Sequence, residues 1–112
     1  MTVSYTTAQQ AVEDASNIVL GYLKSGSYGV LYNLMSADFK STFSKNDFEN
    51  SFIGSTAVSS GQVSGAPKVY GANNEWAEQA TTLFLTDGSS QKYLNVYHLE
   101  NSAWTLFGTE EQ

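Results

Sequence analysis

The apolar residues of this chain change their spacing near the middle, from a period of about 3.6 residues to a period of two. Side chains repeat every 3.6 residues on one face of a helix and alternate along a strand, so the first half predicts helices and the second half strands. No charge run or internal repeat separates the two halves. The pattern therefore indicates a single α+β domain over residues 1–112, in which residues 1–6 form a flexible lead.

The most regular helical pattern runs from Ala8 to Leu23. Thr6 or Thr7 can provide its N-cap, and Gly26 can end it. We expect the apolar stripe of this helix to face the core, and it consists of Ala8, Ala11, Val12, Ala15, Ile18, Val19, Tyr22 and Leu23.

Three serines mark the starts of further short helices, because serine is a favoured N-cap. Ser27 precedes residues 28–35, Ser36 precedes 37–43, and Ser44 is followed three residues later by Asp47 in a variant of the capping box. Large apolar side chains are expected to form the buried sides of these helices, with the phenylalanines as core rather than as an aromatic ligand box. They are Val30, Leu31, Leu34, Met35, Phe39, Phe43, Phe48, Phe52 and Ile53.

A Gly/Ser-rich connector at residues 54–61 leads into segments with strand alternation. Segment 61–71 is expected to be an edge strand because Pro67 cannot donate to a ladder. Segments 75–86, 91–100 and 104–111 are joined by turns at 87–88 and 100–103. The prediction is a four-stranded antiparallel sheet, with a β-bulge near residues 80–82 to reconcile the mixed alternation of the second strand.

Alternation sorts the third strand into two faces. His98 shares one face with Leu94 and Val96, while Tyr93, Asn95, Tyr97 and Leu99 point the other way. Since both faces carry large apolar groups, the sheet either buries both or uses one for binding.

The composition excludes several functions. Five lysines against eleven acidic residues give a formal charge of −6, which repels nucleic acid and anionic membrane surfaces. No apolar run approaches the roughly 20 residues of a membrane span, so we expect no membrane insertion by this segment. With one histidine, no cysteine and scattered carboxylates, we expect no metal and no cofactor.

Two stretches resemble a known superfamily. Residues 19–52, "VLGYLKSGSYGVLYNLMSADFKSTFSKNDFENSF", and residues 93–108, "YLNVYHLENSAWTLFG", are similar to the NTF2-like (cystatin-like) superfamily, and in particular to small extracytoplasmic domains of bacterial lipoproteins and penicillin-binding proteins. In the closing hairpin Ser102 replaces the usual turn glycine, which implies a different or less favourable turn. The resemblance implies N-terminal helices packed in the concavity of a curved sheet, and an extracellular or cell-surface location.

The resemblance also suggests where chemistry would lie, because enzymes of this fold place polar residues in the cavity between sheet and helices. His98, Glu78 and Tyr22 are the residues to test for catalysis. Each also has an ordinary interpretation: a histidine satisfied by a neighbour, an outward glutamate and a buried, hydrogen-bonded tyrosine. No second titratable group is expected on the strand face of His98.

A face rich in tyrosine is the second candidate site, because aromatic and neutral polar groups favour protein contacts. These residues equally suit ordinary strand packing. We therefore expect a non-enzymatic binding or assembly module that self-associates or binds a protein partner through its sheet. The alternative is a small cavity enzyme or binder that acts on an apolar small molecule. The candidate binding face comprises Tyr70, Trp76, Tyr93, Asn95 and Tyr97.

Overall fold

The computed structural model describes residues 4–112, which form four helices and five strands. Residues 1–3 of the expected flexible lead lie outside the described residues, and residues 4–6 have no regular structure. In chain order the elements are α1 (Thr7–Ser25), α2 (Tyr28–Asn33), α3 (Ala37–Thr42), α4 (Lys45–Asn50), β1 (Val58–Val63), β2 (Lys68–Tyr70), β3 (Trp76–Leu85), β4 (Ser90–Glu100) and β5 (Ala103–Glu111).

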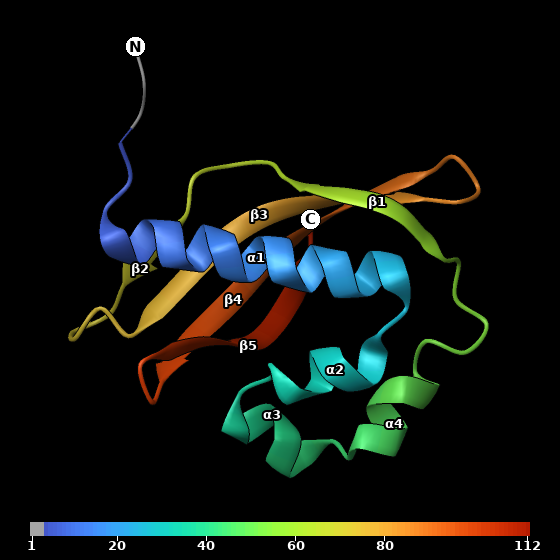
Figure 1. Cartoon of the computed structure of the whole chain (residues 1–112), viewed down its shortest axis with the longest axis horizontal. Helices are drawn as coiled ribbons and strands as arrows, with labels where there is room; N and C mark the ends of the chain where they lie inside the picture. The colour runs from blue at the N-terminus through green and yellow to red at the C-terminus, as the bar shows by residue number, and fades with distance from the viewer. Residues whose placement is uncertain (1–3) are drawn as a thin grey trace.

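The helices cover one face of a curved antiparallel sheet, as the sequence predicted. Figure 1 shows α1 lying across the strands, while α2, α3 and α4 gather at one end of it. The strand order is β1-β3-β4-β5, with β2 also paired to β3. This arrangement encloses a core between α1, α2 and the central strands.

The predicted caps of α1 are confirmed. The hydroxyl of Thr6 accepts from the backbone N–H of Gln9, and the side chain of Gln9 accepts from the backbone N–H of Thr6. Gly26 ends the helix with a φ of 71°, a left-handed conformation that glycine adopts without steric cost.

The three serines predicted as N-caps of the short helices are confirmed in position, and two of them make a side-chain capping bond. Ser36 accepts from the backbone of Phe39, and Ser44 accepts from the backbone of Asp47. Ser27 is the N-cap residue of α2, but its side chain makes no capping hydrogen bond. The backbone N–H of Leu31 donates instead to the backbone carbonyl of Ser27.

Several residues predicted to be buried are exposed. α3 and α4 are short helices of six residues at the edge of the molecule (Figure 1), and each contributes only part of its apolar side to the interior. The stripe of α1 is likewise narrower than predicted, because the sheet contacts one side of that helix. The exposed residues are Ala11, Ile18 with a relative exposure of 50%, Val30 with 46%, Phe43 with 48% and Ile53 with 78%.

The predicted edge strand is two strands rather than one, so the sheet has five strands instead of four. β1 already begins at Val58, within the segment predicted as a connector, and pairs with the C-terminal half of β3. β2 pairs with the N-terminal half of β3. Between them Pro67 lacks the N–H that a ladder needs, and its carbonyl accepts from the side chain of Gln9 in α1.

The predicted bulge in β3 is wrong. The pairing of β3 with β4 runs without interruption from Trp76↔His98 to Phe84↔Ser90. Register shifts occur instead at Val58/Ser60 in β1 and opposite Val96/Tyr97, where Phe107 is the additional residue of β5. The mixed alternation of β3 has another cause. Its helix-facing positions include Ala77, Gln79 and Thr81, which are all buried, and two of these three residues are polar.

Gln79 shows why a polar residue can lie at such a position. It is 1% exposed, and its amide nitrogen donates to Glu13 in α1 at 3.0 Å and to the carbonyl of Gly65 at 2.8 Å. These bonds satisfy the amide nitrogen and join β3 to α1 and to the β1–β2 connection, whereas the buried amide oxygen of Gln79 has no partner among the described residues.

Candidate functional site

An apolar cavity of about 250 Å³ lies between the sheet and the helices. Its walls come from α1, the α2–α4 segment and strands β3, β4 and β5, so no single element forms it. The lining residues are Val19, Leu20, Leu23, Leu31, Met35, Phe39, Phe48, Phe52, Thr81, Leu83, Tyr93, Asn95, Leu106, Gly108 and Thr109.

The helical wall of the cavity is a chain of aromatic contacts. Phe48 meets both Phe39 and Phe52 edge-on, with ring centroids 5.7 and 5.2 Å apart. Phe52 in turn stacks on Tyr28 at 3.9 Å. Aromatic contacts of this kind add to the area they bury, so the short α3 and α4 are held by their rings.

The strand wall carries a buried polar group, Asn95, which is 3% exposed. Its amide nitrogen donates to the hydroxyl of Tyr97 at 3.1 Å, and that hydroxyl lies 2.7 Å from the hydroxyl of Ser16 in α1. Burial raises the pKa of the Tyr97 phenol, and the hydrogen bonds to Ser16 and Asn95 oppose part of that rise. Tyr97 is therefore a neutral anchor that fixes the orientation of the Asn95 amide.

Two other polar residues line the cavity through groups that are already bonded. The Tyr93 hydroxyl donates to Gln91. The hydroxyl of Thr81 donates to the carbonyl of Tyr93 at 3.5 Å. The rings and methyl groups of these residues therefore contribute mainly apolar surface to the cavity.

The three residues predicted for catalysis do not meet in the cavity. His98 and Glu78 alternate with the helix-facing residues of their strands and so lie on the opposite face, which we call the outer face. Tyr22 packs against the core from α1 without lining the cavity. None of the three residues predicted for catalysis therefore lines the cavity.

The candidate binding face divides between the two sides of the sheet. Tyr93, Asn95 and Tyr97 face the helices, whereas Trp76 and its cross-strand partner Tyr70 lie on the outer face. Sequence analysis did not identify Ser16 or Thr81, because the local sequence does not indicate which hydrogen bond a serine or threonine hydroxyl will make. Asn95 was identified, although as part of a surface.

On the outer face, three rings form what we call the outer aromatic cluster: Trp76, His98 and Phe107. The centroids of Trp76 and His98 lie 4.4 Å apart, and those of Trp76 and Phe107 lie 5.0 Å apart with nearly perpendicular planes. Phe107 remains 38% exposed. The cluster thus presents a large aromatic side chain to solvent on the outer face.

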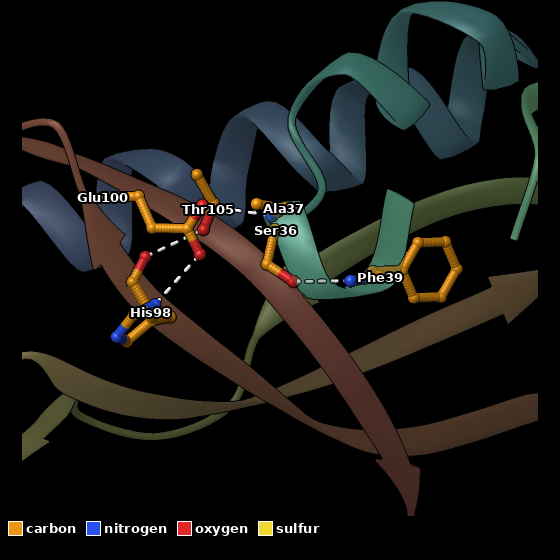
Figure 2. A network of polar contacts seen from close by, with 6 residues as sticks. All are labelled: Ser36, Ala37, Phe39, His98, Glu100 and Thr105. Carbon is orange, nitrogen blue, oxygen red and sulfur yellow. Dashed lines mark hydrogen bonds and ion pairs between the residues drawn. The ribbon is translucent and has the colours of Figure 1, made fainter. Parts of the chain in front are cut away.

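His98 also belongs to a polar network, shown in Figure 2. Its Nδ1 lies 2.9 Å from Glu100, whose other carboxylate oxygen accepts from the backbone N–H of Ala37 at the start of α3. The prediction that no titratable group shares the strand face of His98 was wrong. Glu100 lies two residues further along the same strand, so alternation alone would have placed it there.

The network has one clear electrostatic consequence. The hydrogen bond from His98 lowers the pKa of Glu100, partial burial acts in the opposite direction, and the backbone N–H of Ala37 adds to the lowering. Glu100 is therefore a charged tether between β4 and α3 at neutral pH.

Two further observations concern residues 4–112 as a whole. No helix there combines the length and the apolar composition that crossing a bilayer requires. No three histidine, aspartate or glutamate side chains in this range come together as a metal site.

The chain matches no model of a protein family, and no curated protein matches it in sequence. Among solved structures, it is similar to a Campylobacter jejuni protein described as a candidate NTF2-like transpeptidase. The two share 12% identity, the match covers 87% of this chain and 97% of the other, and the TM-score is 0.61. Together with helices that cover one face of a curved antiparallel sheet, this match shows that the chain has the NTF2-like fold.

Proposed function

We propose that this domain is a non-enzymatic binding module that holds a small apolar molecule in the cavity under its helices. The observation that carries the proposal is the character of the walls: the 15 described lining residues are apolar or neutral. Ligand sites are usually concave, mostly apolar and supplied with a few polar groups that orient the ligand. Asn95 is the buried group of that kind here.

Binding without catalysis fits the positions of the titratable groups. General acid–base catalysis needs a group within hydrogen-bond reach of the reacting atoms, with a pKa near the working pH. Within the described residues, carboxylates and imidazole are absent from the cavity walls, and the Tyr93 phenol donates to Gln91. His98, the base that sequence analysis singled out, lies on the outer face.

A fluorescent, uncharged apolar probe such as N-phenyl-1-naphthylamine tests the proposal. We expect saturable binding to the wild type, and at least tenfold weaker binding to Val19→Phe, since Val19 is 3% exposed and lines the cavity. Ile18→Phe is the matched control, because Ile18, the neighbour of Val19 on α1, is 50% exposed. Equal binding by both variants, or no binding by the wild type, would contradict cavity binding.

A second function is supported by the outer aromatic cluster: contact with a protein partner or a second copy through the sheet. Aromatic residues are enriched at interface centres, and Phe107 and Phe84 are each 38% exposed on this face. Tyr70 and Trp76, two residues of the predicted binding face, lie here as well.

Sedimentation velocity over a range of concentrations tests self-association. We expect the wild type to form a concentration-dependent dimer that Phe107→Ser abolishes. Ile53→Ser, at a site 78% exposed on the helical side, is the control and should leave the dimer intact. A strictly monomeric wild type would refute self-association and leave a different protein as the partner.

We also propose an extracytoplasmic location. One support is the structural similarity to a candidate transpeptidase. The other is the composition: charged residues make up only 14% of the chain, so neutral polar residues supply much of the surface. Fractionation of the source cells with an antibody to this domain tests it, and recovery with cytoplasmic markers would overturn it.

A further inference from the structure

We propose that the molecule bound in the cavity is uncharged, compact and largely apolar, with one hydroxyl-type donor that bonds to the side-chain carbonyl of Asn95. This inference rests on the proposed binding function and adds the chemical class of the ligand and the residue that recognises it.

The exclusion of charge follows from the cavity walls. A charged ligand must lose its hydration, and only an opposite charge or several hydrogen bonds can offset that cost. Within residues 4–112, no lysine, histidine, aspartate or glutamate lines the cavity. A carboxylate or an ammonium group inside it would thus be left uncompensated.

The recognition of a donor follows from the bonding of Asn95. The amide nitrogen of Asn95 is committed to the Tyr97 hydroxyl, which Ser16 holds from the opposite layer. Within residues 4–112 the amide oxygen has no such partner, although the residue is 3% exposed and lines the cavity. An acceptor in this position favours a ligand that brings a hydrogen-bond donor.

The other polar groups compete weakly for such a ligand. The Tyr93 hydroxyl already donates to Gln91, and the Thr81 hydroxyl is directed at the carbonyl of Tyr93. Thr109 is exposed, so water can satisfy it. Asn95 is accordingly the wall residue whose side-chain carbonyl can accept a hydrogen bond from a bound ligand, and a single acceptor suits a ligand with a single donor.

Size limits the ligand further. A volume of about 250 Å³ is slightly below the roughly 300 Å³ at which pockets for drug-sized molecules begin. A two-ring molecule is therefore a suitable probe. We choose 2-naphthol, 2-methylnaphthalene, which has a methyl group in place of the hydroxyl, and 2-naphthoate, which carries a charge.

The experiment measures the affinities of the three probes by calorimetry or by probe displacement. We expect the wild type to bind both neutral probes and to bind 2-naphthoate at least tenfold more weakly than 2-naphthol. In Asn95→Leu the ratio of naphthol to methylnaphthalene affinity should fall about tenfold, the value of one neutral hydrogen bond. Thr81→Val, which alters another polar wall residue, should leave this ratio unchanged.

The outcomes separate the two proposals. If the wild type binds neither neutral probe, cavity binding itself fails. If both bind but the ratio is unchanged in Asn95→Leu, or falls equally in Thr81→Val, the assignment to Asn95 is wrong while cavity binding stands. Binding of 2-naphthoate as tightly as 2-naphthol overturns the exclusion of charge.

A measurement on the unaltered protein covers the case in which Asn95→Leu does not fold. In NMR spectra the side-chain amide signals of Asn95 should shift on adding 2-naphthol and shift much less on adding 2-methylnaphthalene. Equal shifts with the two probes would refute the hydrogen bond.

Discussion

At the scale of single residues, the hydroxyl of Tyr97 is the polar link between the sheet and the long helix. It is fully buried, and it joins Asn95 in β4 to Ser16 in α1. A buried group of this kind contributes little while paired and costs much when its partner is lost. The bond therefore fixes the position of α1 over the cavity as well as the Asn95 amide.

Tyr97→Phe should lower the free energy of unfolding by about 1–3 kcal/mol, because Ser16 and Asn95 lose their buried partner. Urea denaturation measures the change. Tyr22→Phe is the matched control, since Tyr22 is only partly buried against the core, and it should change stability by less than half as much. Equal effects would mean that the hydroxyl of Tyr97 has no special role.

The β4–β5 turn offers a stabilising change. Asn101 and Ser102 have φ of 49° and 66°, so the loop keeps the left-handed geometry of an Asn-Gly turn although serine replaces the glycine. Ser102→Gly should raise the free energy of unfolding by about 0.5–1 kcal/mol, because glycine adopts this conformation without the strain of a side chain.

Thermal and urea unfolding measure this gain, and the other hairpin supplies the control. Ser89 lacks a positive φ, and both its backbone and its hydroxyl donate to Asp87. The same substitution, Ser89→Gly, should therefore destabilise the protein. A loss of stability in Ser102→Gly would contradict the strain argument.

At the scale of elements, α3 depends on its contacts with the strands rather than on its own length. It has six residues, too few to be stable alone, and none of them is buried. Ser36 caps it, and the carboxylate of Glu100 accepts from the N–H of Ala37. Since Phe39 of α3 lines the cavity, these contacts also hold part of the cavity wall.

Glu100→Gln should destabilise the protein by about 1 kcal/mol at pH 7, because a charged acceptor at a helix start is replaced by a neutral one. The pKa of Glu100 is lowered in the folded state, so its contribution is present above the ordinary value of 4.5 and is lost as the pH falls below it. The stabilities of wild type and variant should then converge.

Urea unfolding at neutral pH and at a pH below the ordinary value tests this expectation. Glu110→Gln serves as the control, because Glu110 is an exposed carboxylate of β5, and its effect should be small at both pH values. A difference between wild type and Glu100→Gln that stays constant with pH would exclude the charged tether.

The elements differ in how far the sequence predicts them. The α1 helix, the caps Ser36 and Ser44 and both β-hairpin turns follow from local rules, and the structure confirms them. The division of the predicted edge strand into β1 and β2 near Pro67 does not follow from local rules. It depends on the pairing of both strands with different halves of β3. Burial of Phe43 and Ile53 was overestimated, since a local pattern cannot tell where the sheet ends.

At the scale of the whole molecule, the layered architecture was predictable and the site was predictable only in part. Alternation correctly placed Tyr97 and His98 on opposite faces of β4. It could not say which face the helices cover, because both are apolar. Asn95 was therefore predicted as part of a binding face and not as a residue that lines a cavity. The residues predicted to form one tyrosine-rich face lie on both faces of the sheet.

Phe107, the additional residue of β5, belongs to the outer face of the sheet and does not line the cavity on the other face. Removing it would restore a regular ladder to β4 and keep Thr109 opposite Asn95, so the cavity would persist. The same deletion would take away a ring of the outer aromatic cluster. Loss of this single residue would thus alter the exposed aromatic surface of the sheet while the residues that line the cavity keep their register.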